Sequence, residues 1–180
     1  MLLPIVFTLA LLSVLPTPSH AAVKQATPDS LVIQDSRVLH VTPAQAYAAL
    51  VDVARWWNSE HTWSGSATNL SLKPEAGGCF CERWKDNSVQ HMQVLWASKD
   101  HLLRLQGGLG PLQNMAVQGV MTFTLKPGDA GSTLQFEYRV NGTSGSGLDK
   151  LAAGVDGVLM QQLDRLQRYA ETGNANSARP

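Results

Sequence analysis

Glu82 is the polar residue whose sequence neighbours most clearly suggest a catalytic or ligand-binding role. It lies in the segment CFCERW, where strand alternation would place Phe80, Glu82 and Trp84 on one face. The two aromatic residues indicate that this face points inward, where burial would raise the pKa of a carboxyl group unless a donor compensates. Glu82 is therefore a candidate general acid or base, or a hydrogen-bond anchor that orients a ligand. A glutamate at the sheet margin that reaches water or Arg104 is the structural alternative.

Whether His91 joins Glu82 depends on the turn between two expected strands. A two-residue turn at positions 86–87 would set Glu82 opposite His91 and create a carboxylate–imidazole acid/base pair. A three-residue turn at positions 85–87 would instead leave His91 on the other face, as a surface residue, which weakens the case for an enzyme. The burial of apolar side chains specifies strand register. The three-residue turn is favoured because it pairs Phe80 with Met92 and gathers the large apolar residues on one face. These residues are Phe80, Trp84, Met92, Val94, Trp96, Leu103 and Leu105.

Three of the five tryptophans, Trp56, Trp57 and Trp63, lie within eight residues of one another. A tryptophan at the mouth of a cavity offers a ligand a flat apolar wall and one N–H donor. Ordinary packing of short helices onto a sheet is the alternative for each of them.

Cys79 and Cys81 are the only cysteines. On a regular strand their Cα atoms would be about 6.6 Å apart with Cβ atoms similarly separated, whereas a disulfide needs Cβ atoms about 3.8 Å apart. A bridge would therefore require a bulge or turn, and we expect two packing thiols. A metal site shared with His91 is a weaker alternative, because zinc takes three or four ligands.

The net charge and the absence of several catalytic motifs exclude some classes of function. The 14 basic and 14 acidic residues give no net charge, which argues against a surface for nucleic acid or for anionic membranes. The sequence contains no nucleophile elbow, no H-E-x-x-H pair and no P-loop. We therefore predict neither a cofactor nor a metal.

The first residues are typical of an export signal. Residues 2–15 are almost continuously apolar, and Ser19 and Ala21 have the spacing of a cleavage site. The two prolines that follow the apolar run end it too early for a spanning helix of about 20 residues. We predict a signal peptide over 1–21, cleavage after Ala21, a periplasmic or secreted protein and no stable membrane insertion; an uncleaved anchor or a buried helix is the alternative.

The order of expected elements defines an α+β fold with an antiparallel sheet. Thr42-Pro43 supplies a helix N-cap followed by proline at the first helical position. Alternation over 132–140 predicts a half-buried strand, and apolar residues at three- and four-residue steps predict one long helix from Leu148 to Tyr169. The other expected elements are strands at 30–41, 69–73, 79–84, 89–97, 101–106 and 115–126, and helices at 44–52 and 54–58.

Several motifs resemble the START-like superfamily of helix-grip proteins, and within it the SRPBCC proteins related to the activator of Hsp90 ATPase domain. They are TPAQAYAALVDVARWW, PEAGGCFCERW, HMQVLWASKDHLLRLQGGLGP, STLQFEYRVNG and GLDKLAAGVDGVLMQQLDRL. The resemblance spans a domain at 30–171 and leaves a flexible tail at 172–180. It implies a curved antiparallel sheet that grips the C-terminal helix around an elongated apolar cavity. Similar proteins bind lipids, hormones or polyketides, and some cyclise or hydrolyse them. The chaperone-activating role is not carried over, because an exported protein would not meet a cytosolic chaperone.

Residues and resemblance together predict an exported single-domain binder of a small hydrophobic or amphipathic molecule. Glu82 would orient the ligand, and the expected lining is Trp57, Trp63, Phe80, Trp84, Met92, Met121, Phe136 and Leu159. An enzyme of the cyclase or hydrolase type that uses Glu82, with His91, as acid/base is the first alternative. A protein-interaction module that docks a partner on the outer sheet face, without an internal cavity, is the second.

Overall fold

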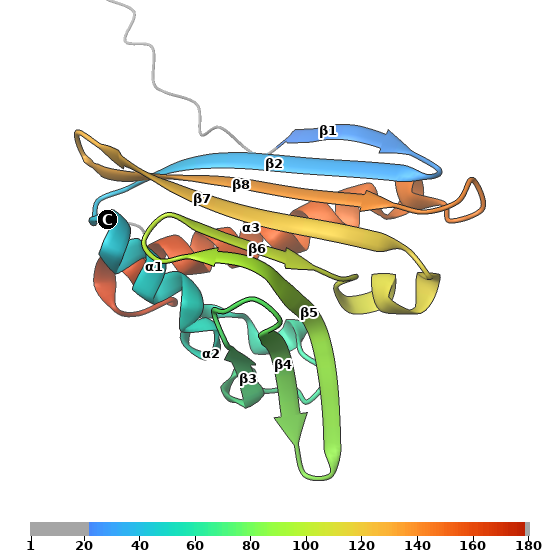
Figure 1. The fold of residues 1–180 in the computed structure, drawn as a ribbon, viewed down its shortest axis with the longest axis horizontal. Coiled ribbons are helices and arrows are strands. Elements are labelled where there is room, and N and C mark those ends of the chain that lie inside the picture. The colour runs from blue at the N-terminus through green and yellow to red at the C-terminus, as the bar shows by residue number, and fades with distance from the viewer. Residues whose placement is uncertain (1–21, 179–180) are drawn as a thin grey trace, which may run out of the picture.

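The structure is a computed structural model that describes residues 22–178, so the predicted signal peptide lies outside the described residues. Figure 1 shows one curved sheet with the long C-terminal helix along one of its faces. The strands are β1 (Ala22–Thr27), β2 (Ser30–Leu39), β3 (Leu70–Leu72), β4 (Cys79–Trp84), β5 (Asn87–Ser98), β6 (Leu102–Gln106), β7 (Gln118–Gly128) and β8 (Gly131–Asn141). The helices are α1 (Pro43–Val51), α2 (Val53–Trp56) and α3 (Leu148–Thr172), with short 3-10 turns η1 (Ser59–His61), η2 (Ala67–Asn69) and η3 (Gly110–Met115).

The described strands form one antiparallel sheet in the order β1-β2-β8-β7-β6-β5-β4-β3. The predicted α+β helix-grip fold is therefore confirmed. β1 was not expected, because its sequence AVKQAT lacks the apolar alternation that marks a half-buried strand. It pairs with β2 at the edge of the sheet.

Local sequence signals determine where the helices begin and end. The hydroxyl of Thr42 accepts a hydrogen bond from the Gln45 backbone N–H, and the Gln45 side chain accepts one from the Thr42 N–H. This capping box confirms the predicted start of α1. α3 ends at Gly173, whose φ of 75° lies in the left-handed region that favours glycine.

The core lies between the inner face of the sheet and the apolar stripe of α3. Phe123 and Phe136 pack with ring centroids 5.2 Å apart. Tyr138 is fully buried, and burial raises its pKa to about 12. Its hydroxyl donates to the Gly107 carbonyl and accepts from the Leu109 N–H. These two hydrogen bonds fix the segment before η3 against β8.

A bulge changes the direction of Trp96. The β5–β6 register shifts between Val94 and Trp96, which moves later residues of β5 to the opposite face. Trp96 is 51% exposed. The Arg104 guanidinium lies over its ring, with Cζ 5.6 Å from the ring centroid. The prediction that Trp96 joins the inner apolar face is wrong for this reason.

Residues after α3 fold back onto it. Where the sequence predicts a flexible tail, Ala175 is buried and its carbonyl accepts from Arg168, while Arg165 donates to Asn176. Within 22–178, no helix has the length and apolar character needed to cross a membrane.

Candidate functional site

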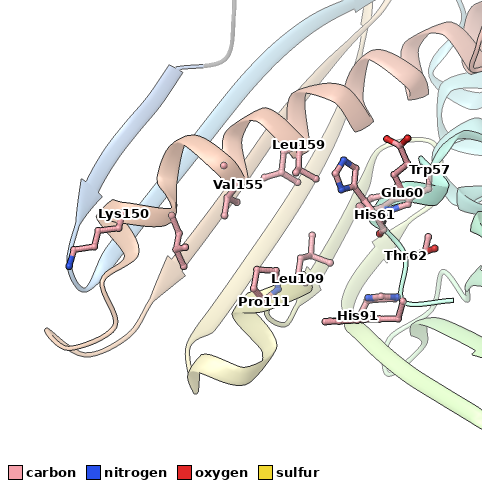
Figure 2. Close-up of a pocket in the computed structure, with 15 residues that line it drawn as sticks. Trp57, Glu60, His61, Thr62, His91, Leu109, Pro111, Lys150, Val155 and Leu159 are labelled. Atoms are coloured by element: carbon pink, nitrogen blue, oxygen red, sulfur yellow. Dashed lines mark hydrogen bonds between the residues drawn. The ribbon is translucent and has the colours of Figure 1, made fainter. Parts of the chain in front are cut away.

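A cavity of about 500 Å³ opens between α3, η3, β5 and the segment after α2. Figure 2 shows its lining side chains converging from these elements. Most of the wall is apolar, and its main contributors are Trp57, Leu109, Leu151, Val155, Val158 and Leu159. The volume falls within the range of about 300–1,000 Å³ that is usual for small-molecule sites.

The α3 wall explains why the apolar stripe of this helix is incompletely covered. Leu159 is buried, but Leu151 and Val155 are only half-buried and face the cavity. Gly154 also lines it, and a Cβ at this position would meet no atom within 4 Å. Part of the stripe predicted to cover the sheet therefore lines open space.

One hydrogen bond within the segment that carries Trp57 and Trp63 and another to α3 hold this segment in place. The Trp57 indole N–H donates to the His61 carbonyl at 3.0 Å, and the Asn58 N–H donates to the buried Gln162 side chain at 2.8 Å. Trp57 is buried, with its ring edge-on to Phe80, whereas Trp63 is 52% exposed. Trp57 thus forms the inner wall and Trp63 the rim.

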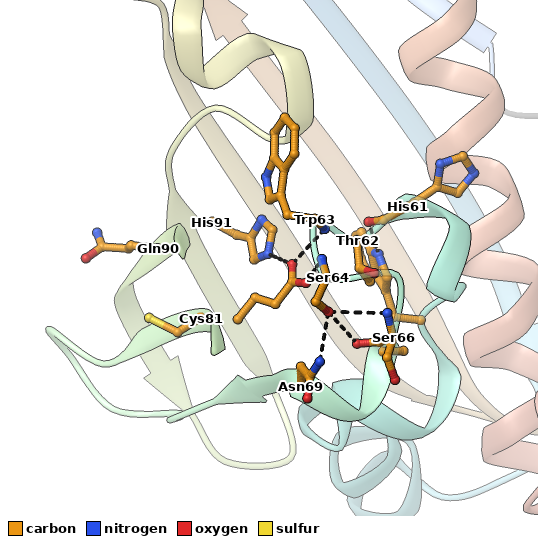
Figure 3. A network of polar contacts seen from close by, with 12 residues as sticks. His61, Thr62, Trp63, Ser64, Ser66, Asn69, Cys81, Gln90 and His91 are labelled. Atoms are coloured by element: carbon orange, nitrogen blue, oxygen red, sulfur yellow. Dashed lines mark hydrogen bonds and ion pairs between the residues drawn. The ribbon is translucent and has the colours of Figure 1, made fainter. Parts of the chain in front are cut away.

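The Glu82 carboxylate is completely buried and accepts three hydrogen bonds, drawn as dashed lines in Figure 3. Oε1 accepts from the Ser64 N–H at 2.5 Å. Oε2 accepts from the Trp63 N–H at 3.1 Å and lies 2.9 Å from Nε2 of His91. Burial raises the pKa of this carboxyl, but the hydrogen bonds from Ser64, Trp63 and His91 outweigh burial, so its pKa lies below the usual value.

His91 is 6% exposed and lines the cavity. Burial lowers its pKa, and the neighbouring Glu82 only partly offsets this effect. The ring is therefore neutral at neutral pH. Because an ionised carboxylate only accepts hydrogen bonds, Nε2 must carry the proton and donate a hydrogen bond to Glu82.

The inward position of His91 corrects a prediction. The hairpin turn is Lys85-Asp86, so neither expected turn is found, and Trp84 pairs with Asn87. The register then shifts between Phe80 and Cys81, where His91 is the extra residue of β5. Beyond this bulge Phe80 pairs with Met92 as predicted, but His91 turns inward and is not a surface residue.

The same irregularity corrects the prediction for the cysteines. Cys79 and Cys81 form a disulfide with Cα atoms 5.3 Å apart, closer than the roughly 6.6 Å of a regular strand. The β4–β5 ladder is irregular between Phe80 and Cys81, which lies within the span of the bridge. Both sulfurs are thereby removed as metal ligands, and within 22–178 no three His, Cys, Asp or Glu side chains gather to hold a metal.

The other predicted site residues are distributed unevenly around the cavity. Trp57, Trp63 and Leu159 line it together with His91. Phe80, Met92, Met121 and Phe136 lie in the packed core, and Trp84 is half-buried at the end of β4. Glu82 stands behind His91 and does not line the cavity. That any of these residues contacts a ligand stays a prediction.

The expected lining included Leu159 of α3 but not Leu151 and Val155 of the same helix, nor Leu109 and Pro111 at the start of η3. Leu109 and Pro111 are placed by the Tyr138 hydrogen bonds, which no local pattern encodes. Leu151 and Val155 belonged to the expected helical stripe, but nothing in their spacing distinguishes a residue that lines a cavity from one that packs on a sheet.

The fold and cavity together define a helix-grip, START-like protein. A family model described as polyketide cyclase / dehydrase and lipid transport matches residues 30–171. The chain belongs to this family, and the predicted SRPBCC relationship is confirmed.

Solved structures with low sequence identity share the fold. A conserved protein of unknown function from Enterococcus faecalis is 13% identical, with a TM-score of 0.62 over 88% of this chain and 80% of that one. The Aha1 dimer from Colwellia psychrerythraea is 15% identical, with a TM-score of 0.59 over 79% and 97%. A protein of unknown function from Staphylococcus aureus is 12% identical, with a TM-score of 0.59 over 81% and 96%. No curated protein matches the sequence.

Proposed function

We propose that this protein is an exported carrier that holds one small hydrophobic or amphipathic molecule in the cavity beside α3. The observation that carries the proposal is the apolar wall around about 500 Å³ of open space. Leu151 and Val155 are left half-buried there. An apolar guest that covered them would gain about 25 cal/mol for each Å² of apolar surface removed from water.

Export is supported by two features of the chain. The apolar residues 2–15 precede a small-residue cleavage pattern that ends at Ala21. The Cys79–Cys81 disulfide suits the oxidising conditions outside the cytosol, where such bonds persist. Both features support a mature protein in the periplasm or outside the cell.

Two glycines of α3 provide a matched test of the cavity. A Cβ on either Gly154 or Gly157 would meet no atom within 4 Å, but only Gly154 lines the cavity. Leucine favours a helix over glycine by about 0.8 kcal/mol, so replacement of either glycine by leucine should leave the protein folded. We expect Gly154→Leu to reduce binding of an apolar fluorescent probe at least about tenfold, whereas Gly157→Leu should bind like the unmodified protein.

The same experiment can refute the proposal. If the unmodified protein takes up no apolar probe, or if the two leucine variants bind it equally, the cavity beside α3 is not the binding site. Native mass spectrometry of the protein purified from its own exported fraction would then identify what co-purifies, and a carrier should retain a ligand of discrete mass.

An acid/base enzyme is a second candidate, favoured by the His91–Glu82 pair. An imidazole that faces an apolar cavity and is oriented by a buried carboxylate can take a proton from a bound molecule. His91 would be the catalytic base and Glu82 the residue that positions it. This arrangement suits a cyclase or hydrolase.

Turnover distinguishes the two candidates. A carrier releases its guest with unchanged mass, and replacement of Glu82 by Gln should then leave an apolar guest bound with a modest loss of affinity. An enzyme releases an altered mass, and the same replacement should slow turnover by about 10²-fold or more. The hypothesis of an interaction module expects the space beside α3 to be filled, so the cavity does not favour it.

A further inference from the structure

His91 has one ring nitrogen committed to the protein and one that is not. Nε2 lies 2.9 Å from the Glu82 carboxylate. Within 22–178, Nδ1 makes no hydrogen bond, and the residue as a whole is 6% exposed. A polar atom that the protein leaves without a partner at a cavity wall is available to water or to a ligand.

The free nitrogen is reached from the cavity. His91 belongs to the cavity wall, and Nδ1 is not among the polar atoms that the fold seals off without a partner. Figure 3 shows the Trp63 indole on the side of the His91 ring that faces away from the Glu82 hydrogen bond. Nδ1 and the rim tryptophan therefore border the same end of the cavity.

The protonation of Nδ1 follows from the hydrogen bond that Nε2 makes. The Glu82 carboxylate accepts hydrogen bonds from two backbone N–H groups and can only accept from His91 as well. A neutral imidazole that donates through Nε2 carries a lone pair on Nδ1. The cavity thus presents an acceptor at this point, and it needs a donor.

We propose that the ligand of this cavity is a hydroxylated hydrophobe, a phenol or alcohol whose O–H donates to Nδ1 of His91 while its apolar body lies along α3. The inference rests on the proposed function, which it makes more specific. An anionic carboxylate does not suit this end, because it has no proton to donate and Glu82 already places a negative charge behind the ring. Lys150, the cation of the lining, lies at the opposite end of the cavity in Figure 2.

The test compares β-naphthol with its methyl ether, which has nearly the same apolar body but no O–H. By isothermal titration calorimetry at neutral pH, we expect the unmodified protein to bind β-naphthol about tenfold more tightly, the effect of one hydrogen bond to an otherwise unpaired group. His91→Phe should bind both compounds equally. His40→Phe is the control, since His40 is exposed and does not line the cavity, and it should keep the preference.

Each outcome decides between the two proposals. Equal affinity of the unmodified protein for both compounds would overturn the hydroxyl inference and leave the carrier function standing. Failure of both compounds to bind would overturn the carrier function and this inference together. A preference that survives in His91→Phe would show that another group recognises the hydroxyl, and would overturn the assignment to Nδ1.

Nitrogen NMR of the unmodified protein supplies a second measurement that does not depend on the stability of a variant. In the ligand-free protein, Nδ1 of His91 should have the chemical shift of an unprotonated ring nitrogen and Nε2 that of a protonated one. Addition of β-naphthol should move the Nδ1 resonance upfield, as expected for an acceptor in a new hydrogen bond, and the methyl ether should not. A protonated Nδ1 would refute the inference.

Discussion

Replacement of Glu82 by Gln removes one charge from the centre of the site at almost no change in volume. The carboxylate satisfies three donors, the N–H groups of Trp63 and Ser64 and Nε2 of His91. The carboxamide has one acceptor oxygen and one NH₂ group, so it cannot accept at both positions. At least one backbone donor must then face another donor.

The structure indicates which contact is kept. The shortest hydrogen bond comes from Ser64, at 2.5 Å from Oε1, so the amide oxygen should take that place. The NH₂ group would then face the Trp63 N–H, which loses its partner. A hydrogen bond to a charged group contributes about 1.5–3 kcal/mol, and an unsatisfied buried donor costs about 1–3 kcal/mol.

We expect Glu82→Gln to lower the free energy of unfolding by about 2–4 kcal/mol. For a domain of this size, that corresponds to a decrease in Tm of about 5–15 °C. Urea denaturation followed by tryptophan fluorescence measures the loss. Glu75→Gln is the control, because Glu75 forms an exposed ion pair with Lys73, and such pairs contribute about 0–1 kcal/mol.

A loss below about 0.5 kcal/mol for Glu82→Gln, equal to that of the control, would refute the claim that this carboxylate holds the Trp63 segment. The same variant has a second consequence. With an amide N–H opposite Nε2, His91 should become the acceptor there and carry its proton on Nδ1. The cavity would then present a donor, and the preference for β-naphthol over its methyl ether should disappear.

Two further predictions concern pH and packing. The pKa of His91 in the folded protein lies below its ordinary value of 6.5, so the unfolded chain takes up a proton at a higher pH than the folded protein does. The free energy of unfolding should therefore fall as the pH drops below about 6.5. His91→Phe should remove that part of the pH dependence. A Cβ on Gly119 would lie 2.3 Å from the Gly107 carbonyl and 2.7 Å from the Tyr138 hydroxyl, so Gly119→Ala should lower the unfolding free energy by about 2–3 kcal/mol. Gly128→Ala, whose nearest neighbour is 3.6 Å away, should cost less than about 1 kcal/mol, and equal losses in the two would contradict the packing argument.

The elements that the sequence predicted well are those with a regular local period. The apolar steps of α3 and the Thr42 capping box depend on residues a few positions apart. The alternation of β8 is equally local, and its burial alternates as expected. These features follow from the geometry of one element and need no knowledge of its neighbours.

Predictions that depended on strand register were less reliable, because one extra residue reverses every side chain beyond it. His91 and Trp96 were both assigned to the wrong face, each next to a bulge in β5. A signal for the first bulge is present in the sequence. Val89, Met92 and Val94 are the apolar residues that turn inward, and the step from Val89 to Met92 is three residues where a regular strand requires two.

The bulge also changes what Glu82 does in the site. A regular strand would make it the polar group that meets the ligand, which is the role predicted from the sequence. With His91 turned inward, the imidazole occupies the cavity wall and the carboxylate supports it from behind. The two carboxylate oxygens also hold the rim, because Oε2 accepts from the Trp63 N–H and Oε1 from the Ser64 N–H. A change at Glu82 should therefore alter the polar contact and the cavity entrance together, whereas a change at His91 should alter only the first.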